Sequence, residues 1–274
     1  MTCLLSVVTP DALIQISDRR LTLPDGTMFD DNANKVILFD GRMAIAYAGL
    51  SQIVGVQTDL WLVRVLTNPP IRSLARAIYA IRDRATAAFR GWARRPSDKA
   101  HHRLVFSFIG WARLPDRPDL HVVVGFISNC HDRDGTLQPT ARDDFSIYRE
   151  TLEPGRFHGM LAPAVPLSTA EYDRLVERNQ TAENLEDHVV NLVTAVREVA
   201  LRDTSVSTNV LAVTIPRAVV EQTDGRRMIV LAGSPLTLDV IGSLYFPDKE
   251  APIHYGPHTV YAGMGLTDFQ GGPV

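Results

Sequence analysis

The chain has 274 residues, of which 45% are apolar and 22% are charged, and its formal net charge is −3. The length suffices for one large domain, or for a core of about 200 residues with additions. The small net charge gives no reason to expect nucleic acid as a partner. No stretch approaches the roughly 18 apolar residues that span a bilayer, and the N-terminus lacks the basic and apolar regions of a signal peptide. We therefore expect a cytoplasmic protein with no membrane partner.

The two cysteines, Cys3 and Cys130, do not indicate a disulfide framework. The segment Cys130-His131-Asp132 holds three types of metal ligand, but they are adjacent in sequence rather than spaced to converge on one ion. We interpret this segment as a surface turn. The sequence therefore predicts neither a metal site nor a cofactor.

The first 48 residues predict four strands arranged in two hairpins. Each strand is a short apolar run, and turn signals lie between the runs at Thr9-Pro10-Asp11, Leu23-Pro24-Asp25-Gly26 and Asp40-Gly41-Arg42. The strands are expected at residues 3–8, 11–17, 35–39 and 43–48.

Pairs of helices then alternate with further strands. Apolar side chains recur at helical spacing over residues 51–66 and 70–92, with Pro70 in a first-turn position. A second helix pair is predicted after Ser168-Thr169 and over 182–201, where Thr181 with Asn184 gives the cap. Further strands are expected at residues 103–111, 120–128, 145–149 and 209–215, and an added hairpin is expected at 227–232 and 240–246.

This order of elements predicts an α+β fold. Blocks of strands that alternate with helix pairs differ from the strand–helix alternation of a parallel doubly wound sheet. They fit a four-layer αββα sandwich of two antiparallel sheets, each flanked by a helix pair. We assign residues 1–216 to this domain, with an insert at about 93–119. Residues 217–274 form a C-terminal extension that we expect to pack on or between subunits.

Four residues in the first 49 have the chemistry of an N-terminal nucleophile. Removal of Met1 is typical when the second side chain is small, and it would leave Thr2 with a free α-amine beside its hydroxyl. An α-amine with a pKa of about 7.7–8.0 can take the hydroxyl proton near neutral pH. A nearby Lys35 would lower that pKa further, Asp18 would orient the lysine, and the backbone N–H of Gly49 could stabilise an oxyanion.

The segments Met1–Val7, Ile16–Thr22, Asn34–Val36 and Ala46–Gly49 resemble the proteasome β-type peptidases, and especially their bacterial members. The resemblance implies a four-layer N-terminal-nucleophile hydrolase fold in which Thr2 is the nucleophile and Asp18 and Lys35 assist it, with Gly49 N–H at the oxyanion and Thr22 in support. It covers roughly the first 50 residues well and residues 100–215 loosely.

Two later segments match the family less closely. Leu201–Ser207 resembles an Arg-Asp-x-x-Ser-Gly loop, which implies that Asp203 lies beside the nucleophile. Val206 occupies the position of the family's serine, with Ser205 and Ser207 on either side as candidate support. The family's Gly-Ser-Gly would fall near Gly159, where the sequence His158–Ala162 contains no serine.

Three functional hypotheses follow from these observations. The first is a threonine hydrolase that cleaves peptide bonds after removal of Met1. The second is a catalytically inactive proteasome-like subunit that serves as an assembly scaffold, and the third keeps the chemistry with a small amide as the substrate. The resemblance implies a homo-oligomer, in a ring or stacked assembly, under the first two hypotheses. It also leaves room for an ATP-dependent unfoldase as a partner.

Overall fold

The computed structural model describes residues 2–10, 12–22, 27–39, 41–71, 73–92, 102–114, 117–152, 160–164, 167–223, 226–231, 242–245, 253–254 and 258–260. For the described residues within 113–120 and 160–164, for 216 and for those after 217, it describes the backbone alone. Within these ranges the chain is a mixed α/β structure with antiparallel sheets and four helices. No helix in them is long and apolar enough to cross a bilayer.

The first sheet contains the N-terminal hairpin at its centre. All of its neighbouring strands pair antiparallel. In sheet order the strands are β12 (Met160–Ala164), β1 (Leu4–Val8), β2 (Ala12–Asp18), β13 (Val210–Pro216), β16 (Gly242–Tyr245) and β17 (Ile253–His254).

The second sheet contains the other N-terminal hairpin. Its neighbours pair antiparallel except at one edge, where β18 runs parallel to β5. The expectation of two purely antiparallel sheets is therefore wrong at this edge, because the chain returns to it from the first sheet instead of through a hairpin. In sheet order the strands are β11 (Ser146–Leu152), β10 (Arg117–Ser128), β9 (Leu104–Leu114), β6 (Met43–Gly49), β5 (Val36–Phe39) and β18 (His258–Val260).

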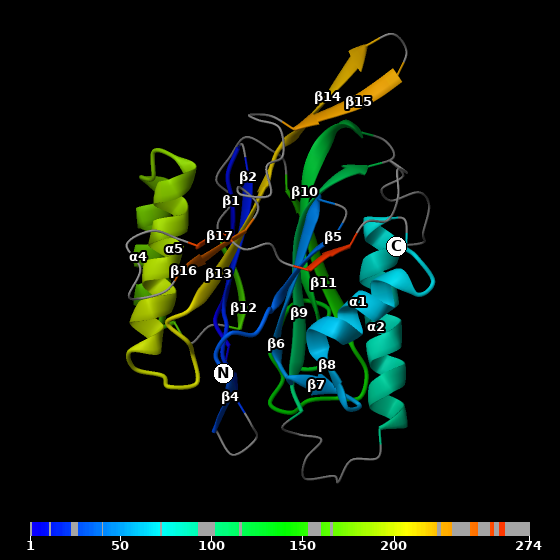
Figure 1. Cartoon of the computed structure of the whole chain (residues 1–274), viewed down its shortest axis with the longest axis vertical. Helices are drawn as coiled ribbons and strands as arrows, with labels where there is room; N and C mark the ends of the chain where they lie inside the picture. The colour runs from blue at the N-terminus through cyan, green and yellow to red at the C-terminus, as the bar shows by residue number, and fades with distance from the viewer. Residues whose placement is uncertain are drawn as a thin grey trace.

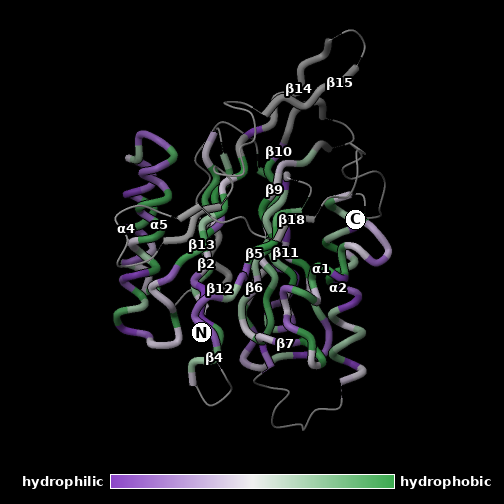
Figure 2. Tube along the Cα trace, in the orientation of Figure 1, coloured by the Kyte–Doolittle hydropathy of each residue, from purple (hydrophilic) through white to green (hydrophobic). Residues whose placement is uncertain are grey.

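Two helix pairs lie on the outer sides of these sheets (Figure 1). The pair α4 (Thr169–Gln180) and α5 (Leu185–Ala200) lies beside the first sheet, and α1 (Thr58–Thr67) and α2 (Leu74–Gly91) lie beside the second. One buried apolar cluster joins α5 to β1, β2 and β13, another joins α1 and α2 to the second sheet, and a third lies between the sheets. Figure 2 shows the same pattern, with hydrophobic strands in the interior and mixed helices outside.

Side-chain caps fix where three of the helices begin. Ser168 accepts from Glu171 N, and the Glu171 carboxylate returns to the Ser168 backbone in a capping box at the start of α4. Asn184 caps α5 by accepting from Asp187 N, so the predicted cap at Thr181 is wrong; Thr181 ends α4. Ser73 caps α2, which therefore begins after Ser73 and not at Pro70.

The helix predicted from residue 51 begins seven residues later. Residues 52–57 form a small hairpin, β7 (Gln52–Ile53) and β8 (Val56–Gln57), whose two turn residues both have positive φ, +48° at Val54 and +77° at Gly55. Positive φ at both central residues belongs to the tight turn that matches the strand twist. Apolar periodicity in 51–57 was misleading because Ile53 is buried from a strand.

The strands after residue 216 pair differently from the prediction. The expected hairpin of 227–232 with 240–246 does not form, because β14 (Ala218–Thr223) pairs with β15 (Arg226–Leu231) and β16 pairs with β13. Strand β12 was not predicted, and β9 and β10 are longer than predicted. Thus β16 and β17 extend the first sheet and β18 extends the second, while β14 and β15 form a sheet of their own. The division of the chain at 216 stays a prediction.

Candidate active site

Thr2, Asp18 and Lys35 meet between the two sheets. Leu4 pairs with Ser17 across β1 and β2, which places the start of β1 beside the end of β2. Lys35 directly precedes β5 of the second sheet and reaches across the interface. Its Nζ lies 3.2 Å from Thr2 Oγ1 and 3.1 Å from Asp18 Oδ2. The prediction that these three side chains come together is therefore supported by direct contacts.

The carboxylate of Asp18 is held from several sides. Its Oδ1 accepts from the backbone N–H of Cys3 at 2.8 Å. Its Oδ2 accepts from Lys35 Nζ and from the backbone N–H groups of Arg20 and Ser207, at 2.9 and 3.3 Å. Several donors compensate a buried charge better than one ion pair does. Asp18 thus connects the residue before β1, the segment just after β2 and the loop before β13.

Burial controls the protonation of this site. The side chains of Lys35 and Asp18 are only 1% and 0% exposed. Burial lowers the pKa of Lys35 below its ordinary value, because a charged ammonium loses its hydration, and the carboxylate of Asp18 opposes that shift. Burial also raises the pKa of the Cys3 thiol strongly, and the charge of Asp18 adds to this effect. Cys3 therefore stays a protonated core residue and does not compete with Thr2 as a nucleophile.

Gly49 ends β6 on the same side of the sheet as Lys35. Tyr47 N donates to Lys35 O, and Gly49 lies two residues further along the strand. The residue has φ +107°, and a Cβ there would lie 2.1 Å from the carbonyl oxygen of Arg103. Strand packing alone thus requires a glycine at this position. An additional role for its N–H at an oxyanion stays a prediction.

The loop after α5 contains the other predicted residues. Asp203 accepts hydrogen bonds from the backbone and hydroxyl of Ser205. Burial raises the pKa of Asp203, but these hydrogen bonds outweigh it, and the net pKa lies below the ordinary value. The Ser207 hydroxyl accepts from Asn209 N, and Val206 is buried in the core. The loop is therefore ordered by its own hydrogen bonds.

The contacts among Thr2, Asp18 and Lys35 do not include Thr22. Thr22 pairs with Met28 between β3 (Leu21–Thr22) and β4 (Met28–Asp30), and it makes no hydrogen bond to Thr2, Asp18 or Lys35. Gly159 lies outside the described residues, as does Met1. Their contributions to the site stay predictions.

The interpretation of Cys130-His131-Asp132 as a surface turn is wrong for its first two residues. Cys130 and His131 are buried, and Ser128 Oγ lies 3.2 Å from Cys130 Sγ and 2.8 Å from His131 Nδ1. The exposed turn begins at Arg133, after the half-buried Asp132. In the part of the chain that the structure describes, no three His, Cys, Asp or Glu side chains are placed to hold a metal ion.

The structure adds Asp31 and two arginines to the surroundings of the site. Arg20 Nε lies 2.8 Å from Asp31 Oδ1, and Arg20 Nη1 donates to Thr204 O at 2.6 Å. Arg19 donates to the carbonyl groups of Asn32 and Ala33. Both arginines therefore fix the segment that leads to Lys35.

Asp31 connects this segment to the loop before β13. It accepts from Ser207 and from Asn209 Nδ2 as well as from Arg20. Partial burial raises the pKa of Asp31, but the hydrogen bonds from Arg20 and Ser207 lower it by more. The net pKa is therefore below its ordinary value. Sequence reasoning missed Asp31 because an acid in a polar stretch gives no sign of its distant partners.

Comparisons with known proteins do not identify a function for this chain, so its function must be inferred from the geometry described above. No protein-family model matches the chain. No curated protein matches it either. Among solved structures, the chain is similar to Anbu (ancestral beta-subunit) from Yersinia bercovieri, with a TM-score of 0.49 and 11% identity over 79% of this chain and 82% of that one. A likeness at this level transfers no residue role.

Proposed function

We propose that this chain is a proteasome-like threonine hydrolase that cleaves peptide or other amide bonds after removal of Met1. Its fold would then be the four-layer αββα sandwich of the N-terminal-nucleophile hydrolases. The observation that carries the proposal is the contact of Lys35 Nζ with both Thr2 Oγ1 and Asp18 Oδ2. Lys35 forms a buried ion pair with Asp18, and its additional contact with the Thr2 hydroxyl distinguishes this pair from a purely structural one.

The proposed reaction uses two steps at one hydroxyl. The Thr2 hydroxyl attacks the substrate carbonyl while its own α-amine takes the proton, and Lys35 stabilises the negative charge that develops on Oγ1. The backbone N–H of Gly49 donates to the oxyanion. The protonated amine then gives its proton to the leaving amine, and an ester with Thr2 remains. Water hydrolyses that ester and regenerates the free Thr2 hydroxyl.

One observation favours the scaffold as the second candidate. Val206 is buried where the related loop has a serine, Ser205 is hydrogen-bonded to Asp203, and Ser207 is hydrogen-bonded to Asn209 and Asp31. No serine of this loop is thus committed to the amine of Thr2. Under both functions we propose a cytoplasmic homo-oligomer, in which residues 217–274 pack on or between subunits, and an ATP-dependent unfoldase as a candidate partner for the active form.

Mass spectrometry of the N-terminal peptide tests the proposal. We expect the purified protein to lack Met1 and to gain one adduct on Thr2 when it is treated with a β-lactone or an epoxyketone. Thr2→Ser should retain labelling, and Thr2→Ala should abolish it. Retention of Met1 would overturn the catalytic proposal, and a Met-free protein that is never labelled would identify the scaffold instead.

Asp31→Asn tests the connection between the outer network and the site. We expect the rate of Thr2 labelling to fall about tenfold, because Arg20 and the loop before β13 lose their common partner and the site becomes less well ordered. The depressed pKa of Asp31 also predicts the effect of pH. The contribution of Asp31 to the stability of the fold is fully present above the unfolded pKa of about 3.9. It is lost as the pH falls through the lower folded pKa.

Urea unfolding between pH 3 and pH 7 measures the second effect. The difference in unfolding free energy between the wild type and Asp31→Asn should be constant above about pH 5 and should shrink below about pH 4. The control is Asp173→Asn, which changes an exposed acid on α4. It should change neither the rate of Thr2 labelling nor the unfolding free energy. An equal loss in the control would contradict a special role for Asp31.

A further inference from the structure

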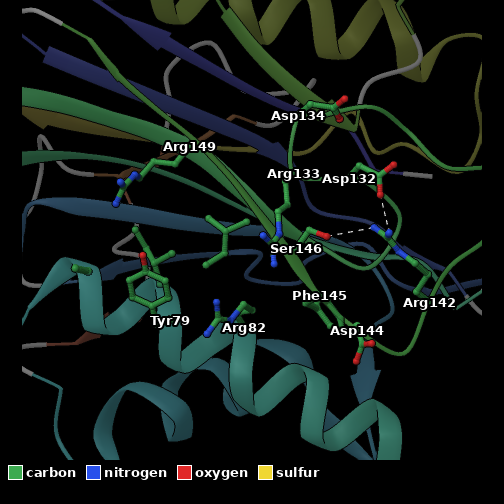
Figure 3. A pocket seen from close by; sticks show the side chains of 13 residues that line it. Tyr79, Arg82, Asp132, Arg133, Asp134, Arg142, Asp144, Phe145, Ser146 and Arg149 are labelled. Atoms are coloured by element: carbon green, nitrogen blue, oxygen red, sulfur yellow. Dashed lines mark hydrogen bonds and ion pairs between the residues drawn. The ribbon is translucent and has the colours of Figure 1, made fainter. Parts of the chain in front are cut away.

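A pocket lies between α2 and the segment that enters β11, apart from the Thr2 site. Its volume is about 870 Å³, and none of its lining residues belongs to the Thr2 site. Tyr79 and Arg82 of α2 form one wall, and Arg133, Phe145 and residues of β11 form the other. Figure 3 shows Arg82 and Arg133 pointing into this space from opposite walls.

The positive charges of the pocket are only partly compensated from within. Asp132 is paired with Arg142 at 2.6 Å, and Asp144 is paired with Arg90, which lies outside the lining. Arg133 is exposed, and its side chain makes no ion pair or hydrogen bond to the residues that the structure describes. Arg82 is paired at 2.6 Å with Asp83, which lies outside the lining, so Arg133 is the less compensated of the two guanidinium groups that face this space. An anion between them is attracted by the charge of both.

The walls of the pocket are held in place before any ligand binds. Arg142 donates to His131 O and to Ser146 Oγ, which closes the loop that contains Arg133. Phe145 N donates to Thr86 Oγ1 of α2, and its ring packs edge-on against Phe89, with centroids 4.9 Å apart. A preformed pocket of this size is the usual form of a small-molecule site.

The lining also has an apolar side. Ile78 and Phe145 are buried beside the arginines, and Ile147 is half-buried. Arg82 lies over the ring of Tyr79, with its Cζ 5.0 Å from the centroid, which orients the guanidinium. Planar guanidinium groups match the oxygens of carboxylate or phosphate groups in pairs.

We propose that this pocket binds a small organic anion whose carboxylate or phosphate lies between Arg82 and Arg133 and whose apolar body packs on Ile78 and Phe145. This inference is independent of the hydrolase function. The shared chemistry is an oxyanion attached to an apolar group. Both a phosphate and a carboxylate fit this chemistry, so the test uses one probe of each kind.

Calorimetric titration with three probes of similar shape tests the proposal. Phenyl phosphate and phenylacetate are the charged probes, and benzyl alcohol is the neutral one. We expect at least one charged probe to bind with a Kd of about 1 mM or below, and benzyl alcohol to bind at least tenfold more weakly. Tighter binding of phenyl phosphate would identify phosphate as the preferred anion, and tighter binding of phenylacetate would identify carboxylate.

Matched arginine variants locate the binding. The double variant Arg82→Gln/Arg133→Gln should weaken the charged probe at least tenfold, while Arg76→Gln, an exposed arginine of the same helix outside the lining, should change its Kd less than twofold. All of these arginines are on the surface, so thermal unfolding should show an intact fold. Absence of binding by both anions, equal binding of benzyl alcohol, or equal losses in the double variant and Arg76→Gln would each overturn the proposal.

Discussion

Lys35→Met is expected to reduce covalent labelling and hydrolysis at Thr2 by about a thousandfold, at the upper end of the loss when one donor that stabilises a developing charge is removed. The substitution keeps an unbranched side chain that is one heavy atom shorter, and it removes the donor that lies 3.2 Å from Thr2 Oγ1. It also leaves Asp18, fully buried, with backbone donors alone. We therefore expect a loss of about 3 kcal/mol in unfolding free energy, at the lower end for a broken buried pair.

The neighbouring residue gives a control for the loss of stability. Val36 is fully buried but belongs to the cluster between the sheets, away from Thr2 Oγ1. Val36→Ala should destabilise the chain by about 2 kcal/mol through a cavity and should retain most of the labelling rate. Lys35→Arg should not rescue the reaction, because the larger planar guanidinium does not fit a site made for an ammonium. Labelling that survives in Lys35→Met would show that the lysine has no chemical role.

The part of the site that the sequence predicts is the part built by local hairpins. The two N-terminal hairpins have clear turn signals and short apolar strands, so the chain positions of Thr2, Asp18 and Lys35 translate directly into neighbouring strand ends. Their convergence still needed the resemblance to a family, because hairpin patterns do not tell how two sheets stack. The contact between Lys35 and Asp18 crosses that stack.

Non-local contacts account for the parts that were missed. Arg20 contacts Thr204, which is 184 residues away in sequence, and Asn209 reaches Asp31 from a similar separation. No periodicity or turn rule connects such positions. The start of the helix predicted at 51–66 is wrong for a different reason, since a hairpin with a two-residue turn at Val54 and Gly55 precedes α1. A left-handed conformation is rare for a β-branched residue such as Val54, and the apolar spacing that the prediction used does not indicate it.

Asp18→Asn is expected to reduce both stability and labelling at Thr2, as Lys35→Met does. Here the lysine, and not the carboxylate, is left without its charged partner. The variant keeps the shape of the side chain but places an amide N–H₂ among the donors that now surround the carboxylate. Lys35 then has no counter-charge in a site where it is 1% exposed. We expect a loss of about 3–5 kcal/mol near neutral pH and a loss of labelling of at least a hundredfold.

The pH dependence of this variant separates a charge effect from a packing effect. Asp18 raises the pKa of Lys35 against the effect of burial, so its removal lowers the folded-state pKa of the lysine further below the unfolded value of about 10.4. The unfolded state then binds more protons than the folded state, and stability rises with pH. The penalty of Asp18→Asn measured by urea unfolding should thus be smaller at pH 9 than at pH 6. In the double variant Asp18→Asn/Lys35→Met, where no buried ammonium remains, the penalty should not change with pH over this interval. A penalty that is the same at both pH values in the single variant would mean that Asp18 acts through its hydrogen bonds to the backbone and not through the charge of Lys35.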